Sequence, residues 1–309
     1  MPSIRAALFI PLLALSACAG AANVCETAKG VTLQVLGSGG PIADDARASS
    51  GYLLWVDGES KILVDAGGGT FLRFGEADAK FGQLDHIAIS HYHTDHSADL
   101  VALLKSGYFS GRDRDLTISG PDGGGPFPGL DSFLEASVGK RGAYAYLSGY
   151  TDGSAGLARL QPLTIDPARR TPVAVFGDDS TAIRIEATGV PHGIVPALAY
   201  RVRVRGKTVV FSGDQNGDEE EFIEFARNAD ALVMHMAVPE NISGAGRRLH
   251  APPSRIGQIA KAAEARVLVL SHFMRRSLRN LDSNIEIVRS HYDGRVIVAE
   301  DLQCIKIND

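Results

Sequence analysis

The chain has 309 residues, a net charge of -5 and an apolar fraction of 45%. This length suits one large domain or two small ones, and the composition is that of a soluble globular protein. The acidic balance provides no overall positive field that would attract a nucleic-acid backbone. The net charge therefore gives no support for a nucleic-acid partner, although it does not exclude a local basic patch.

Residues 1–22 are expected to be an export signal rather than part of the fold. Arg5 supplies a positive region, and residues 6–15 form an apolar stretch too short to span about 30 Å of hydrocarbon. The stretch ends in Leu15-Ser16-Ala17-Cys18, which resembles the lipobox of bacterial lipoproteins, where the cysteine is acylated. Simple cleavage near Ala22 is the alternative. The mature domain, residues 23–309, is accordingly expected to be periplasmic or secreted, or anchored to a membrane through Cys18.

Cys25 and Cys304 form an even pair near the two ends of the mature chain. In an oxidising compartment such a pair is expected to form a disulfide. A bridge that closes so long a loop would stabilise the fold by about 4–5 kcal/mol in the chain-entropy model. Two buried free thiols are the alternative, because the geometry that a disulfide needs cannot be read from a sequence.

Short strands alternate with helices along the rest of the chain. We expect strands at residues 31–36, 52–56, 61–64, 86–90, 173–176, 182–187, 199–204, 208–211, 231–234, 267–270, 295–298 and 302–307. We expect helices at residues 98–105, 219–227 and 284–289, and another that starts at Pro252-Pro253 and buries Ile256, Ile259, Ala260 and Ala263. Residues 107–156 lack periodicity and are expected to be a covering insertion or a plain surface excursion. This order predicts an α/β fold, a single-domain αββα sandwich of two sheets faced by helices.

The string His91-Tyr92-His93-Thr94-Asp95-His96 directly follows a buried strand, where the backbone turns and side chains two positions apart can converge. Imidazole nitrogens and carboxylate oxygens are good zinc ligands. A surface turn does not need four such residues within six positions, and burying them in a core without partners would cost free energy. A polar turn explains one or two of them, but not four. The string therefore predicts a metal site.

Three more donors, His192, Asp214 and His272, also stand at the ends of expected strands. Each is weak evidence alone, because a lone histidine is more often structural than a ligand. Together with the string they give seven donors, enough for two metals that share one carboxylate. Two metals about 3.5–4 Å apart can hold a bridging hydroxide near pH 7 and stabilise a leaving oxygen.

With these residues the chain resembles the metallo-β-lactamase superfamily, and within it the branch of ribonuclease Z and the zinc-type arylsulfatases and phosphodiesterases. The resemblance covers essentially the whole mature sequence. It is carried by the HxHxDH string, Leu36-Gly37-Ser38-Gly39-Gly40-Pro41, Val64-Asp65-Ala66-Gly67, Phe211-Ser212-Gly213-Asp214, and His250 ahead of Ser271-His272-Phe273. It implies an αββα sandwich with two zinc ions at one edge. It assigns His91, His93 and His192 to one zinc and Asp95, His96 and His272 to the other, with Asp214 bridging them.

The same resemblance makes His250 a candidate proton donor to the leaving group, a role that contributes about 10²–10⁴-fold. A helix N-terminal residue without chemistry is the alternative. Where ribonuclease Z commonly has a His-Glu pair, this chain has His235-Met236. That difference puts a carboxylate role at this position in doubt, although His235 could still approach the site.

Several departures favour small substrates over tRNA. Only 22 positions lead from His192 to Asp214, too few for the tRNA-binding arm of long-armed ribonuclease Z, and export would remove the enzyme from precursor tRNA. Zinc β-lactamases generally lack the bridging aspartate. We therefore expect an exported binuclear zinc hydrolase of small esters, foremost an aryl sulfate or a phosphodiester, without a nucleic-acid partner. A bridging hydroxide would attack, Asp95 would orient it, and His250 would protonate the departing oxygen.

Five arginines flank the candidate site in sequence and could grip a sulfate or phosphate, although a solvated helix face explains them as well. They are Arg247, Arg248, Arg275, Arg276 and Arg279. Lactone or thioester hydrolysis and a side β-lactamase activity stay open, as do iron or manganese in place of zinc. A metal-loaded protein that binds a ligand without turnover is the alternative of another class. Oligomeric state and natural substrate cannot be read from the sequence.

Overall fold

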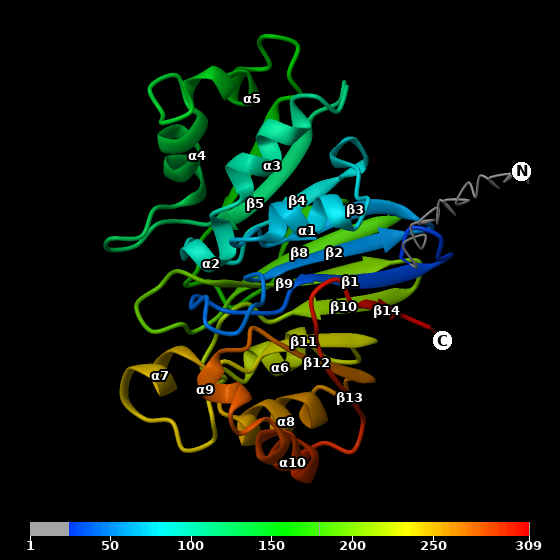
Figure 1. The fold of residues 1–309 in the computed structure, drawn as a ribbon, viewed down its shortest axis with the longest axis vertical. Coiled ribbons are helices and arrows are strands. Elements are labelled where there is room, and N and C mark those ends of the chain that lie inside the picture. Colours follow the sequence, from blue (N-terminus) through cyan, green and yellow to red (C-terminus); the bar gives the residue numbers. More distant parts are fainter. Residues whose placement is uncertain (1–24, 179, 309) are drawn as a thin grey trace, which may run out of the picture.

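Two seven-stranded sheets lie face to face in the centre of the molecule, and helices cover their outer faces (Figure 1). This is the arrangement in a computed structural model, which describes residues 25–178 and 180–308. The expected αββα sandwich is confirmed. The expected export signal at residues 1–22, with Cys18, lies outside the described residues. Within the described part of the chain, no helix combines the length and apolar character needed to cross a membrane.

The first sheet has the strand order β14-β1-β2-β3-β4-β5-β6. Its strands are β1 (Val31–Gly37), β2 (Gly51–Val56), β3 (Glu59–Val64), β4 (His86–Ala88), β5 (Leu116–Pro121), β6 (Leu160–Ile165) and β14 (Cys304–Lys306). Pairing is antiparallel from β14 to β3 and parallel from β3 to β6.

The second sheet has the order β13-β12-β11-β10-β9-β8-β7. Its strands are β7 (Val173–Phe176), β8 (Ile183–Gly189), β9 (Leu198–Val204), β10 (Lys207–Phe211), β11 (Ala231–His235), β12 (Val267–Ser271) and β13 (Arg295–Val298). Pairing is antiparallel from β7 to β10 and parallel from β10 to β13. Strands β8, β10, β11 and β12 therefore end at the same edge of the sheet.

The helices form one layer on each sheet (Figure 1). Those of the first half of the chain are α1 (Thr70–Glu76), η1 (Phe81–Gln83), α2 (Thr94–Ser97), α3 (Leu100–Gly107), α4 (Leu130–Val138), η2 (Ala145–Leu147) and α5 (Gly149–Asp152). Those of the second half are α6 (Glu221–Phe225), α7 (Gly244–Leu249), α8 (Pro253–Ala262), α9 (Arg275–Leu278) and α10 (Leu281–His291).

The core has three layers because each sheet is covered on both faces. Alternate side chains of β1, including Leu33 and Val35, pack between the sheets against residues such as Val202 of β9. Trp55 on β2 and Leu103 on α3 belong to the cluster outside the first sheet. Strands covered on both faces read as nearly continuous apolar runs, which is why most of them could be predicted.

The structure corrects the prediction for residues 107–156. This segment is not a mere insertion, because it carries β5 in the interior of the first sheet and α4 against it. Strand β5 was not predicted from the sequence because it ends in Gly120 and Pro121, which are typical of loops. Strand β6 was missed for a related reason, since Pro162 lies within it. Proline is tolerated there because β6 is the edge strand.

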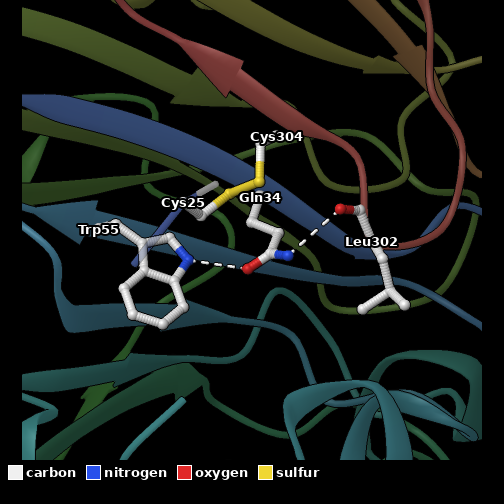
Figure 2. The surroundings of a disulfide bond; sticks show 5 residues. All are labelled: Cys25, Gln34, Trp55, Leu302 and Cys304. Carbon is white, nitrogen blue, oxygen red and sulfur yellow. Dashed lines mark hydrogen bonds between the residues drawn. A yellow bond between two sulfur atoms is a disulfide. The ribbon is translucent and has the colours of Figure 1, made fainter. Parts of the chain in front are cut away.

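A disulfide joins Cys25 to Cys304, with a Cα–Cα distance of 5.7 Å, as expected from the sequence. It ties the beginning of the described chain to β14 (Figure 2). Beside it, the Gln34 side chain accepts a hydrogen bond from Trp55 Nε1 at 2.8 Å and donates one to the Leu302 carbonyl at 3.2 Å. The last strand is thereby fixed to the first sheet by covalent and polar contacts.

Candidate metal centre

All seven predicted donors come together at the edge where the parallel strands end. Those from the first half of the chain follow β4, and those from the second half follow β8, β10 and β12. In open α/β sheets, the carboxyl ends of the strands are where ligands bind. The converging residues are His91, His93, Asp95, His96, His192, Asp214 and His272.

Four of these side chains form a first group, with all candidate ligand atoms within 4.8 Å of one another: His91, His93, His192 and Asp214. His91 Nε2 is 3.0 Å from His93 Nδ1 and 3.9 Å from Asp214 Oδ2. His192 Nε2 is 3.6 Å from the same carboxylate oxygen. This spacing leaves room for one small cation between the four side chains.

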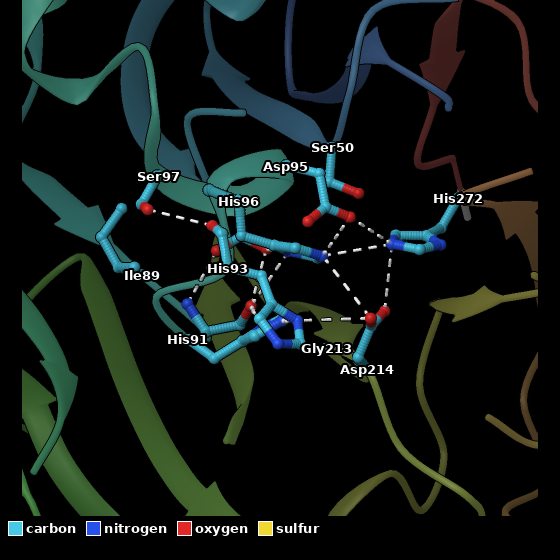
Figure 3. Close-up of polar contacts among 12 residues, drawn as sticks. Ser50, Ile89, His91, His93, Asp95, His96, Ser97, Gly213, Asp214 and His272 are labelled. Carbon is cyan, nitrogen blue, oxygen red and sulfur yellow. Dashed lines mark hydrogen bonds and ion pairs between the residues drawn. The ribbon is translucent and has the colours of Figure 1, made fainter. Parts of the chain in front are cut away.

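The second group consists of His96, Asp214, His235 and His272. Figure 3 shows Asp214 beside His91 of the first group and beside His96 and His272 of the second, so its carboxylate can face both. Asp95, assigned to this group from the sequence, lies next to it, with Oδ2 3.1 Å from His272 Nε2 and 3.6 Å from His96 Nε2. The sequence did not select His235 as a donor.

The donor set fits divalent cations. His192 Nε2 is buried and has no hydrogen-bond partner among the described residues, an arrangement that a cation would satisfy. Burial lowers the pKa of His91, His93 and His192, which favours the neutral, ligating form of each ring. Burial also acts to lower the pKa of His96, but nearby carboxylates outweigh it and hold that pKa well above its usual value.

Outer contacts fix the orientation of two histidines. Asp65, at the end of β3, has Oδ2 2.8 Å from His96 Nδ1 and accepts a hydrogen bond from the Ser90 amide at 2.7 Å. The carbonyl of Leu249 lies 2.8 Å from His192 Nδ1. In both rings the Nε2 atom is thereby left to face the centre, as is usual for metal-ligating histidines.

His235 contacts Asp214 rather than standing apart from the site. Its Nδ1 lies 2.6 Å from Asp214 Oδ1, and its Nε2 lies 3.0 Å from the hydroxyl of Tyr52. The Tyr52 hydroxyl also bonds Ser271 Oγ at 2.9 Å. Because Tyr52 belongs to β2 and Ser271 to β12, this buried chain of contacts joins the two sheets behind Asp214.

A pocket of about 420 Å³ opens over the centre and is lined in part by His93, Asp95, His250 and Arg276. His250 Nδ1 is buried, lies 3.8 Å from Asp214 Oδ2 and has no hydrogen-bond partner among the described residues. Burial lowers the pKa of His250 to about 3, so the ring is neutral in the free protein. A bound anion beside it would favour the protonated form.

Only one of the five flanking arginines, Arg276, lines this pocket. Its Nε donates to the Ala237 carbonyl at 2.9 Å, which holds the guanidinium in place. Arg247 bonds Asp218 and the Asn216 carbonyl instead, and Arg275 bonds the Asp44 carbonyl. Arg276 is itself exposed, so a solvated face still fits these arginines, but Arg276 is the one of the five that also borders the pocket.

Comparison with known proteins shows the family to which the chain belongs. Residues 60–273 match the family described as "Beta-lactamase superfamily domain". Ribonuclease Z of Haloferax volcanii is 28% identical, with 88% of this chain and 93% of that protein covered, and that of Methanosarcina mazei is 26% identical over 88% and 96%. The crystal structure of the short form of human tRNase Z has a TM-score of 0.69 at 21% identity and covers 90% of this chain and 100% of its own.

These relatives correct two expectations. Proteins named ribonuclease Z point to the hydrolysis of nucleic acid, so the expectation of a small ester such as an aryl sulfate is wrong. The expectation that nucleic acid is excluded as a partner is wrong for the same reason. The arguments behind both were net charge, a missing arm and export away from precursor tRNA. None of the three prevents a local surface from binding RNA.

The enzyme class expected from the sequence is confirmed by the matching family and the ribonuclease relatives, and the residues that could hold a divalent metal lie together at one sheet edge. Phosphodiesters are ester bonds that suit such a site. The chain belongs to the β-lactamase superfamily, in its ribonuclease Z-like branch, and is a metal-dependent hydrolase.

Proposed function

We propose that this protein is a metal-dependent phosphodiesterase that cleaves RNA. The observation that carries the proposal is the pocket over two groups of buried or half-buried donors that share Asp214, with both His250 and Arg276 in its lining. The pocket thus combines cation ligands, a candidate proton donor and a fixed positive charge. The ribonuclease Z relatives support RNA as the substrate.

We assign the ligands as the sequence suggested. His91, His93 and His192 would hold one divalent ion, Asp95, His96 and His272 a second, and Asp214 both; zinc is the first choice for such donors. His235 stays outside this set, because the 2.6 Å contact between its Nδ1 and Asp214 Oδ1 leaves no room for an ion between them. A pair of divalent ions supplies activated water near neutral pH and neutralises charge on phosphoryl oxygens.

The chain's own side chains would carry out the remaining tasks. Arg276 faces the pocket from its anchor on the Ala237 carbonyl and would hold a non-bridging phosphate oxygen through its terminal nitrogens. His250 would donate a proton to the departing ribose oxygen once the bound phosphate favours its protonated form. Asp95, whose Oδ2 lies 3.1 Å from His272 Nε2, would keep the attacking oxygen in line with the phosphorus.

The proposal is tested with an end-labelled, unstructured RNA oligonucleotide and purified protein. Zinc- or manganese-loaded protein should cleave it, chelator-treated protein should not, and activity should return when metal is restored. Metal analysis should give two ions per chain. Asp214→Asn should abolish cleavage, whereas Lys306→Gln, at an exposed position of β14, should not. Intact RNA after incubation with fully loaded protein would refute the proposal.

We also propose that the enzyme works outside the cytosol. The N-terminal sequence supports this, and so does the disulfide between Cys25 and Cys304, because such bonds persist in oxidising compartments. Fractionation of cells that express the full chain should place it in the periplasm, the medium or the membrane. Deletion of residues 1–22 should retain it in the cytosol. Incorporation of labelled fatty acid that is lost in Cys18→Ser would identify a lipid anchor.

A further inference from the structure

An exposed apolar surface lies away from the metal centre, around α1, η2 and the end of α3. Nine large apolar side chains are exposed among the described residues, and six of them belong to this surface. The six, called here the aromatic surface, are Phe71, Leu72, Tyr108, Phe109, Tyr144 and Tyr146. Phe109 and Tyr146 are 74% and 62% exposed. Soluble proteins rarely leave such a group of side chains in water without a partner.

A single cation lies among the rings of this surface. Lys105 Nζ is 4.6 Å from the ring centroid of Tyr108, 4.7 Å from that of Phe109 and 5.2 Å from that of Tyr146. All three distances are within the range of cation–π attraction. The rings thus hold an ammonium group at the surface, at the end of a helix whose other end adjoins the metal centre.

The aromatic surface borders a cleft of about 800 Å³, which Phe71, Leu72 and Phe109 help to line. The charged residues of its lining are Lys80, Arg112 and Asp113. Arg112 is only 8% exposed and donates from every guanidinium nitrogen to the carbonyls of Gly82, Leu84, Arg114 and Asp115, so its charge lies beneath the cleft and does not contact a ligand directly. The cations that a ligand could contact here are therefore Lys80 and Lys105, beside the one carboxylate of Asp113, although the whole chain has a net charge of -5.

We propose that the aromatic surface binds a single-stranded segment of the RNA substrate. Aromatic rings stack on bases of any sequence, and cations beside them follow the phosphate backbone. The local excess of positive charge favours RNA over a second copy of this acidic chain. The inference rests on the proposed function. It supplies an RNA contact in a protein whose segment between His192 and Asp214 is too short for an RNA-binding arm.

Helix α3 connects the two places. It begins four residues after His96 and ends beside the aromatic surface, and its eight residues span about 12 Å. In Figure 1 it leads from α2 toward α5 along the outside of the first sheet. A strand held by the rings therefore reaches the metal centre through a short intervening segment.

The test compares RNA with a phosphodiester too small to reach the aromatic surface, bis(p-nitrophenyl) phosphate. The double variant Phe109→Ala, Tyr146→Ala should raise KM for an unstructured RNA oligonucleotide, and its Kd with chelator-treated protein, by about tenfold or more. Its kcat and its kinetics on the small phosphodiester should not change. Lys105→Gln should lower the slope of log Kd against log salt by about 0.7, the value for one lost contact to a single strand.

Two matched controls remove similar groups elsewhere. Leu163→Ala deletes an apolar side chain that is 40% exposed on β6, and Lys306→Gln removes a charge on β14; neither should alter RNA binding. A double variant with the Kd and KM of the parent would overturn the inference. So would sedimentation showing that the parent is a dimer and the double variant a monomer with unchanged RNA affinity, because the aromatic surface would then bind a second copy of the chain. If the parent cleaves neither substrate but binds RNA more tightly than the double variant does, the RNA-binding surface is supported and the proposed function is refuted.

Discussion

At the scale of single residues, His250 is the side chain whose proposed role is most open to test. His250→Ala should slow cleavage of RNA by about 10²–10⁴-fold, because a ribose oxygen is a poor leaving group that needs a proton. Hydrolysis of bis(p-nitrophenyl) phosphate should fall far less, since p-nitrophenolate departs as an anion. The measurement is kcat/KM on both substrates, with metal content matched between variant and parent. Equal losses on the two substrates would show that His250 does not act as the acid.

The same scale shows which site residues a sequence can reveal. The four donors of residues 91–96 were evident because ligand types were crowded into one turn, and His192, Asp214 and His272 followed recognisable strands. Tyr52 gave no such signal, and Asp65, although part of the Val64-Asp65-Ala66-Gly67 motif, was given no role. Asp65 is 31 positions from His96 and Tyr52 is 183 positions from His235, so their contacts exist only after the strands and sheets have come together.

At the scale of elements, the contact of β2 with β11 and β12 gives Tyr52 a positioning role. Its hydroxyl bridges His235 Nε2 and Ser271 Oγ, and His235 in turn orients the shared carboxylate of Asp214. Tyr52→Phe should therefore weaken metal binding by about 10–100-fold, the usual effect of losing an outer contact of a ligand. Competition with a chromophoric chelator measures this affinity without any substrate.

Tyr200→Phe is the matched control for Tyr52→Phe. Tyr200 is equally buried between the sheets, but its hydroxyl bonds the Ile89 carbonyl at 3.0 Å and not a partner of Asp214. Each hydroxyl makes two buried hydrogen bonds, that of Tyr200 also accepting from Ser119 Oγ at 3.2 Å, so both variants should be less stable by about 2 kcal/mol. Only Tyr52→Phe should lose metal affinity; the same affinity in both variants would exclude the positioning role.

Strand β4 carries a second testable contact, at His86. Burial lowers the pKa of His86 to about 3, and its ring nitrogens lie 2.7 Å from Thr117 Oγ1 and 2.8 Å from Ser119 Oγ on β5. The unfolded chain takes up a proton below its usual pKa of 6.5, whereas the folded chain does not. The stability from His86 is therefore complete above pH 6.5 and is lost as pH falls toward 3, by up to about 1.4 kcal/mol per unit.

Urea unfolding of the parent and of His86→Gln across this pH range isolates that contribution. Between pH 6.5 and pH 4, the free energy of unfolding of the parent should fall by more than that of His86→Gln. A constant difference would mean that His86 does not titrate on unfolding as described. The pairing of β4 with β5 is a further reason why β5 escaped sequence prediction, since its half-buried Thr117 and buried Ser119 are polar side chains that contact His86.

At the scale of the whole molecule, the disulfide closes a loop of 279 positions that includes both sheets. In the chain-entropy model a bridge of this length stabilises the fold by about 5 kcal/mol. Strand β14 has only three residues, and it brings Ile305 into the core between the sheets. Without the bridge, this short strand would rely on its pairing with β1 and on the contact of Gln34 with the Leu302 carbonyl.

Cys25→Ser with Cys304→Ser should accordingly lower Tm by roughly 10 °C or more for a chain of this size. A reductant should lower the Tm of the parent to a similar value and leave that of the variant unchanged, which separates loss of the bridge from loss of the sulfur atoms. Metal affinity at neutral pH should stay close to that of the parent, because the bridge lies on β14 and not among the donors. A parental Tm in the variant would show that the polar and apolar contacts of β14 suffice to close the sandwich.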